Sequence, residues 1–287
     1  MENMTPSKDK PHQVIAWIFI AGLLILRLPF LVGGYIFFAN PVWLSPAFQI
    51  GTYLLTACLI WWERSQLANF NIDKLALCII ILFKPIQTII LALWGFKQDP
   101  LAFPNPPSLS LWVISLGLFL ALWLSHTPLP QLTRLSFRWF GSGILVGLIM
   151  VLVMAYPMSL QVDKSLLNGN PNILALFSSS FISIFYQLGY AAVTEEPLFR
   201  GFLWGYLHKA GWRTIWVWLF QAGLFMLGHF YYITKAPISF WLIVPACALI
   251  FGALVWRSKT ISSSLATHAT GNAFGMTIGF IVASFRL

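Results

Sequence analysis

Apolar stretches of about 20 residues recur along the whole chain, and this pattern constrains the fold more than any other feature. A helix of that length spans the hydrocarbon core of a bilayer. The composition agrees, because 59% of the residues are hydrophobic and only 9% are charged. We find no series of short alternating segments of the kind that builds a transmembrane barrel. The sequence therefore predicts an all-α protein, a polytopic transmembrane helical bundle.

We predict eight or nine membrane spans. The two weakest are the short one at 46–62 and the one at 75–95, which carries Lys84 and Pro85 near its middle. The full set of candidate spans is 14–38, 46–62, 75–95, 109–125, 141–160, 173–208, 212–231, 237–256 and 261–284.

The net charge of +9 raises the question of a nucleic-acid partner. The basic residues are dispersed over short loops rather than gathered on one soluble face, so we predict none. They fit the positive-inside rule instead, if the N-terminus is cytoplasmic. The residues that then lie on the cytoplasmic side are Lys8, Lys10, Arg64, Lys74, Arg134, Arg138, Lys209, Arg213, Arg257 and Lys259.

Two adjacent carboxylates lie in or against an apolar span, in the sequence TEEPLFR at 194–200. Ionisable groups at such places are costly and are commonly functional. On a helix, Glu196 and Arg200 are spaced for an ion pair, whereas Glu195 points about 100° away from them. Pro197 removes a backbone donor and predicts a break or kink at the carboxylates. A purely structural Glu–Arg pair at the membrane interface is the alternative for this stretch.

Two further polar groups interrupt the later spans. In FMLGH, Phe225 and His229 lie four residues apart, and in HATGN, His268 and Asn272 do the same. Glu195 and His229 are equally distant along the chain from a predicted turn near Trp212, so they come level in an antiparallel helix pair. Straight helices would leave His268 at another depth. Its approach to Glu195 therefore requires tilt, a shortened segment or a broken helix.

Arg27 and Lys84 also lie inside predicted spans, each close to a proline and without an acid nearby in sequence. For both we expect snorkelling to the interface or pairing between helices.

The three motifs E-E-x-x-x-R, F-x-x-x-H and H-x-x-x-N, in this order on apolar segments, resemble those of the CPBP intramembrane protease family. That family includes CAAX prenyl endopeptidases and bacterial proteins once grouped as abortive-infection (Abi) or bacteriocin self-immunity proteins. The resemblance covers residues 173–284, which we expect to form the catalytic core. Residues 1–170 are expected to form N-terminal transmembrane helices without an assigned motif.

The resemblance implies an intramembrane endopeptidase in which Glu195 and His229 activate a water molecule. His268 and Asn272 would stabilise the oxyanion. The resemblance also implies that Glu196, Arg200 and Phe225 shape the site; these three and the four catalytic candidates complete the predicted site.

The family is also described as metalloproteases, and Glu195, His229 and His268 offer donor atoms suited to Zn²⁺. The residues themselves leave both a metal-free site and a zinc site open. A non-catalytic membrane scaffold or bacteriocin-immunity factor of the same fold is the alternative function. A transporter is disfavoured because no duplicated or inverted broken segments are evident.

The expected partners are the lipid bilayer and a membrane-associated or lipidated peptide or protein substrate. The expected location is the plasma membrane of a bacterium, with multiple spans and a cytoplasmic N-terminus.

Overall fold

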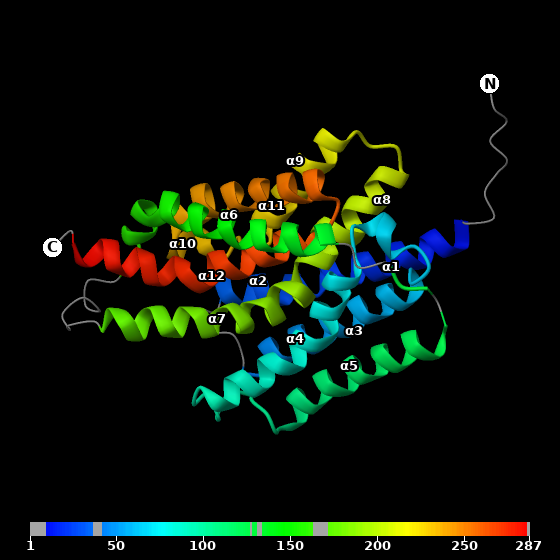
Figure 1. Ribbon diagram of the computed structural model, residues 1–287, viewed down its shortest axis with the longest axis horizontal. Coiled ribbons are helices and arrows are strands. Elements are labelled where there is room, and N and C mark those ends of the chain that lie inside the picture. Colours follow the sequence, from blue (N-terminus) through cyan, green and yellow to red (C-terminus); the bar gives the residue numbers. More distant parts are fainter. Residues whose placement is uncertain (1–9, 37–41, 127, 131–133, 163–171, 286–287) are drawn as a thin grey trace.

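The computed structural model describes residues 10–36, 42–126, 128–130, 134–162 and 172–285, and all regular elements in these ranges are helices (Figure 1). The first half contains α1 (Lys10–Ile25), α2 (Arg27–Ile36), α3 (Leu44–Trp62), the 3₁₀ turn η1 (Leu67–Phe70), α4 (Lys74–Leu93), α5 (Pro106–Leu124) and α6 (Arg134–Ser159). The second half contains α7 (Ile173–Thr194), the π-helix η3 (Pro197–Leu203), α8 (Trp204–Lys209), α9 (Thr214–Leu227), α10 (Tyr232–Lys235), the π-helix η4 (Ser239–Ile243), α11 (Val244–Ser258) and α12 (Ile261–Ser284).

The predicted fold class is confirmed. Within the described ranges, 7 helices are long and apolar enough to cross a membrane. The difference from the predicted eight or nine concerns two segments, 212–231 and 261–284. In the first, α9 has only 14 residues, and in the second, α12 has 24 residues but carries a polar SSS…THATGN stretch.

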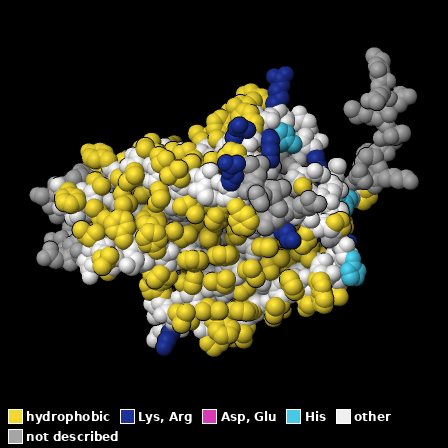
Figure 2. All heavy atoms as spheres, in the orientation of Figure 1, with side chains coloured by type: hydrophobic (Ala, Val, Ile, Leu, Met, Phe, Trp, Pro, Cys, Tyr) yellow, Lys and Arg dark blue, Asp and Glu magenta, His cyan; other side chains and the backbone are white. Residues whose placement is uncertain are grey.

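The surface matches a bilayer environment (Figure 2). Hydrophobic side chains cover most of the visible face, and most of the visible Lys and Arg side chains gather toward the end where α8 and α9 meet. Large apolar side chains on α5 point outward, for example Val113 at 69% and Trp123 at 65% exposure. Apolar groups at such exposure are stable against lipid tails, whereas water would penalise them. The chain is therefore an integral multi-pass membrane protein.

Helix α12 occupies the interior of the bundle, which explains how its polar residues are accommodated. It packs against α6, α7 and α11 and runs beside α6 and α7 in Figure 1. The approach to α6 is close enough to require glycine: a Cβ added at Gly143 would lie 2.3 Å from the Ser263 carbonyl oxygen. At Gly147 it would lie 2.8 Å from Thr270 Cβ. Small residues of this kind let transmembrane backbones meet.

The predicted span 173–208 is broken at the paired glutamates, as expected from Pro197. Helix α7 ends at Thr194, Glu195 leaves helical geometry with φ −135° and ψ −56°, and the wider π-helix η3 begins at Pro197. A break inside a membrane protein exposes backbone carbonyls that need new donors. Here the Thr56 hydroxyl donates to the Val193 carbonyl at 3.3 Å, and Arg27 Nη2 donates to that of Thr194.

Candidate active site

Glu195 lies at the break between α7 and η3 and is buried, with 4% of its surface exposed. Three cationic or potentially cationic side chains surround its carboxylate. Arg27 Nη1 donates to Oε1 at 3.4 Å, His229 Nε2 lies 3.9 Å from Oε1, and His268 Nε2 lies 3.5 Å from Oε2. A buried carboxylate requires such neighbours to remain ionised.

Glu196 points to a different set of partners and is fully buried. Its Oε1 accepts a hydrogen bond from Arg200 Nη1 at 3.2 Å, and it lies 2.9 Å from His268 Nδ1. Its Oε2 accepts from the Ser264 hydroxyl at 2.6 Å. The predicted i,i+4 pair of Glu196 and Arg200 is therefore present, and the same carboxylate also holds an imidazole from α12.

Both histidines are oriented by the hydrogen bonds of their Nδ1 atoms. His268 Nδ1 meets Glu196, an acceptor, and His229 Nδ1 lies 2.9 Å from the Phe225 carbonyl oxygen, also an acceptor. Both Nδ1 atoms therefore carry a proton and donate it. The Nε2 atom of each ring is left facing Glu195, where a neutral ring offers a lone pair. Two bases and a carboxylate thus converge on one point.

Phe225 contributes both backbone and ring to the site. Besides its carbonyl bond to His229, its ring lies 4.7 Å from the His229 ring and 6.0 Å from the His268 ring. The Arg200 guanidinium sits over the same ring, 4.2 Å from its centroid. An aromatic face stabilises a desolvated cation. Phe225 therefore packs against the two imidazoles and the buried arginine.

Straight helices would leave His268 at another depth than Glu195 and His229. A shortened helix removes this mismatch. Helix α9 ends at Leu227, and His229 lies in the turn that follows. A helix of 14 residues is about 21 Å long and does not cross the bilayer core. His229 therefore stops midway, at the level of Glu195 and His268.

Asn272 is placed apart from these groups. Its side chain is exposed, and its amide donates to Gln187 Oε1 of α7 at 3.2 Å. It lies one helical turn beyond His268 on α12, so the motif spacing is kept while the side chain faces outward.

A small pocket adjoins Glu195. The space open to the centre of a water molecule is about 10 Å³, which leaves room for about one water. The residues that line it are Arg27, Leu31, Phe48, Tyr190, Glu195, Gly228, His229 and Tyr231. Polar groups at this wall are numerous enough to hold a water by hydrogen bonds.

For Arg27 the sequence predicts either snorkelling to the interface or pairing between helices. Arg27 pairs between helices, with Thr194 and Glu195. It was not a site candidate, although an arginine inside an apolar span is itself a signal of function. Lys84, the other such cation, is also fully buried, and its Nζ donates to the side-chain carbonyls of Gln49 and Gln87.

The described residues contain no group of three or more His, Cys, Asp or Glu side chains arranged to hold a metal ion. The set of Glu195, His229 and His268 does not meet that arrangement, and a metalloprotease assignment finds no support in this geometry.

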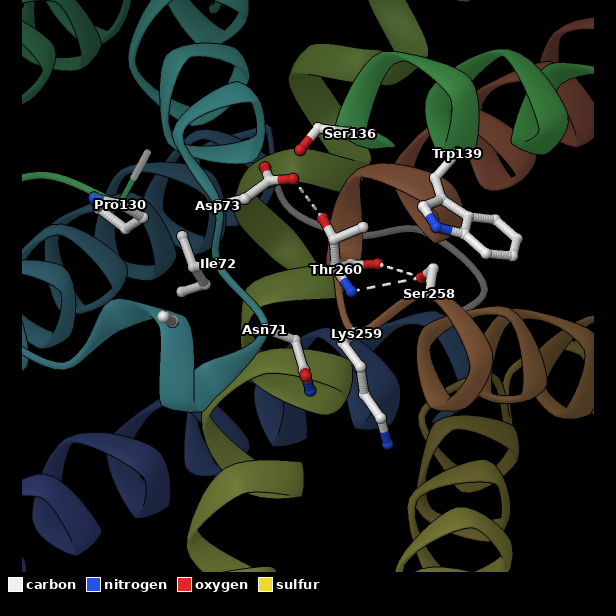
Figure 3. Close-up of a pocket in the computed structure, with 10 residues that line it drawn as sticks. Asn71, Ile72, Asp73, Pro130, Ser136, Trp139, Ser258, Lys259 and Thr260 are labelled. Carbon is white, nitrogen blue, oxygen red and sulfur yellow. Dashed lines mark hydrogen bonds between the residues drawn. The ribbon is translucent and has the colours of Figure 1, made fainter. Parts of the chain in front are cut away.

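A second, wider pocket of about 250 Å³ lies at the turn between α11 and α12, near the start of α4 (Figure 3). Asp73 caps α4 by accepting from the Ala76 amide at 2.8 Å. Its carboxylate also accepts from the hydroxyls of Thr260 and Ser262, each at 2.8 Å. These bonds tie the first turn of α12 to α4 and thereby set the position of the helix that carries His268.

We expect Asp73→Ala to lower the free energy of unfolding by about 2–3 kcal/mol, because it removes one helix cap and two charge-assisted hydrogen bonds. Titration with a denaturing detergent in mixed micelles measures this. Asp99→Ala is the matched control, since Asp99 Oδ1 accepts from the Leu101 amide within its own loop, and its effect is expected below about 1 kcal/mol. Equal effects of the two changes would contradict the role of Asp73.

The fold and the site together define a class: a multi-pass helical membrane protein whose buried glutamates, arginines and histidines meet inside the bundle. Residues 176–274 match the model of the family described as type II CAAX prenyl endopeptidase Rce1-like. The match confirms that this segment resembles the CPBP and CAAX proteases, as its three motifs predicted. The matched segment contains all four predicted catalytic residues. No curated protein and no solved structure matches the chain.

Proposed function

We propose that this protein is an intramembrane endopeptidase that hydrolyses a peptide bond of a membrane-associated substrate. The match of residues 176–274 to the CAAX endopeptidase model supports intramembrane protease activity of the CAAX type in general. The more specific proposal is that Glu195 and His229 activate a water molecule. It rests on the cavity beside Glu195, which has room for about one water and is lined by both residues.

In the proposed reaction, Glu195 and His229 bind this water and take its proton as its oxygen attacks the scissile carbonyl carbon. The free Nε2 of His229 lies 3.9 Å from the Glu195 carboxylate, so one water can hydrogen-bond to both groups and give its proton to either. The proton then passes to the leaving nitrogen as the carbon–nitrogen bond breaks. The break in α7 supports this role because it frees the carboxylate from regular helix packing.

The proposed oxyanion donors are His268 and Asn272. The Nε2 atom of His268 lies 3.5 Å from Glu195 Oε2, next to the place where the reaction occurs. To donate there, His268 must carry a proton on Nε2 as well as on Nδ1. Support for Asn272 comes from its motif position, one turn beyond His268; to donate to the oxyanion, its amide would have to leave Gln187 and turn inward. Glu196 and Arg200 are proposed to fix His268 rather than to touch substrate.

The substrate is proposed to be a membrane-associated or lipidated peptide, reached from the bilayer. The protein is proposed to lie in a bacterial plasma membrane with its N-terminus in the cytoplasm, because that orientation places most basic loop residues inside.

The test is incubation of detergent-purified protein with a library of peptides, each offered with and without a C-terminal prenyl group. Glu195→Ala serves as the inactive comparison. Cleavage of any peptide by the wild type and not by Glu195→Ala supports an endopeptidase, and the prenylated half of the library decides on lipidated substrates. Cleavage that persists in Glu195→Ala would exclude this site as its source.

Pro197→Ala tests whether the break has a function. The new amide would compete with Thr56 for the Val193 carbonyl and favour a straighter helix. We expect an unchanged or higher melting temperature together with lower turnover. Both are measured on one preparation. Unchanged turnover would mean that Pro197 is an ordinary first-turn proline without a catalytic effect.

A further inference from the structure

We propose that Arg27, from the N-terminal helices, is a positioning residue of this site and that the catalytic unit therefore extends beyond the family-matched segment. The expected effect of Arg27 on turnover rests on the proposed function. Its contact with Glu195 rests on the geometry alone. Arg27 lies on α2, well outside residues 176–274. No motif assigns it a role.

Arg27 holds two consecutive residues at the break. One arm of its guanidinium, Nη2, donates to the backbone carbonyl of Thr194, and the other, Nη1, donates to the carboxylate of Glu195 at 3.4 Å. The planar fork of arginine fixes the relative directions of these two bonds. One side chain thus secures both the end of α7 and the side chain that follows it.

The guanidinium also approaches the loop that carries His229. A Cβ added to Gly228 would lie 3.5 Å from Arg27 Nη1, so the backbone just before His229 passes close to the same nitrogen. Arg27 lines the cavity together with Glu195 and His229. It therefore contacts or borders both members of the proposed water-activating pair.

The surroundings of Arg27 keep it from moving. It is buried, with 7% exposure, and its guanidinium lies 5.0 Å from the ring centroid of Phe199 and 5.8 Å from that of Phe48. Its Nε atom is buried without a hydrogen-bond partner among the described residues. A buried cation with a free donor is stable only where a counter-charge is close, and Glu195 supplies it.

The charges around the two glutamates balance in pairs. Glu196 has Arg200 at 3.2 Å, and Glu195 has Arg27 at 3.4 Å. Loss of Arg27 would leave two adjacent buried carboxylates with one arginine. Glu195 would then take up a proton or turn toward another partner, and in either case it would no longer be placed to accept a proton from water.

The test compares Arg27→Met, Arg27→Lys and Lys84→Met in kcat, KM and melting temperature. Lys84 is the matched control, because it is also a buried membrane cation of the N-terminal half but is bonded to glutamines rather than to a carboxylate. We expect Arg27→Met to lower kcat about 100-fold with KM nearly unchanged, since a small misplacement of a catalytic group has this effect. Arg27→Lys should recover about tenfold, and Lys84→Met should keep kcat per folded molecule.

A thermal cycle completes the test without any need for cleavage. Arg27→Met should lower the melting temperature, and adding Glu195→Gln should recover most of that loss, because the second change removes the stranded charge. Additive losses, or equal kcat losses in Arg27→Met and Lys84→Met, would overturn the proposal. A wild-type preparation that cleaves no peptide would refute the proposed function instead, while the cycle would still decide on the Arg27–Glu195 contact.

Discussion

Glu195→Gln is expected to lower the cleavage rate by about 10³-fold while the protein remains folded. The amide is nearly isosteric with the carboxylate and can still accept a hydrogen bond from Arg27, but it cannot take a proton from water. Glu196 cannot substitute, since its oxygens are taken by Arg200, His268 and Ser264. The measurement is kcat on a cleavable peptide, with folding checked by size-exclusion chromatography in detergent.

Glu63→Gln is the matched control for this change. Glu63 is another buried glutamate of the membrane region, at 1% exposure, and its carboxylate accepts from Tyr206 and lies 2.9 Å from His12 Nε2. Loss of a buried carboxylate there is expected to alter stability but not kcat. Normal turnover by Glu195→Gln would refute its assignment as the base, and inactivity of Glu196→Gln at full stability would move that role to its neighbour.

Arg200→Met is expected to produce the largest loss of stability, about 3–5 kcal/mol, because it leaves the buried carboxylate of Glu196 without its cation. Arg200 is fully buried, pairs with Glu196 at 3.2 Å and donates to the Ala248 carbonyl at 3.4 Å. Its guanidinium also lies over the Phe225 ring. Titration with a denaturing detergent in mixed micelles reports the change in the free energy of unfolding.

The double variant Arg200→Met with Glu196→Gln separates lost charge pairing from lost packing. It should recover a large part of the stability, since no unpaired charge remains. Arg213→Met is the control on an exposed arginine and should change stability by no more than about 0.5 kcal/mol. A double variant as unstable as Arg200→Met alone would show that packing, not the ion pair, dominates.

Local patterns in the sequence were sufficient for several features of this protein. The length and polarity of the apolar runs determined the fold class, because a bilayer of fixed thickness selects helices of a fixed length. The pair of Glu196 and Arg200 followed from i,i+4 spacing alone. The break at Glu195 followed from Pro197, since a missing backbone donor acts within a single turn.

The motif order was enough to single out Glu195, His229 and His268 before any of their contacts were known. Their roles in catalysis remain predictions, and so do the division of the chain near residue 170 and the part of Asn272.

Only the tertiary structure decided how these elements meet. The contact of Arg27 with Thr194 and Glu195 joins residues far apart in sequence, and no local spacing encodes it. The level of His229 depends on where α9 stops, and the interior place of α12 depends on close glycine contacts with α6. Hydropathy records how long a helix is and which residues avoid water. It does not record which helices pack together, because that choice is made by the fit of whole surfaces and by buried polar groups that must find partners across helices.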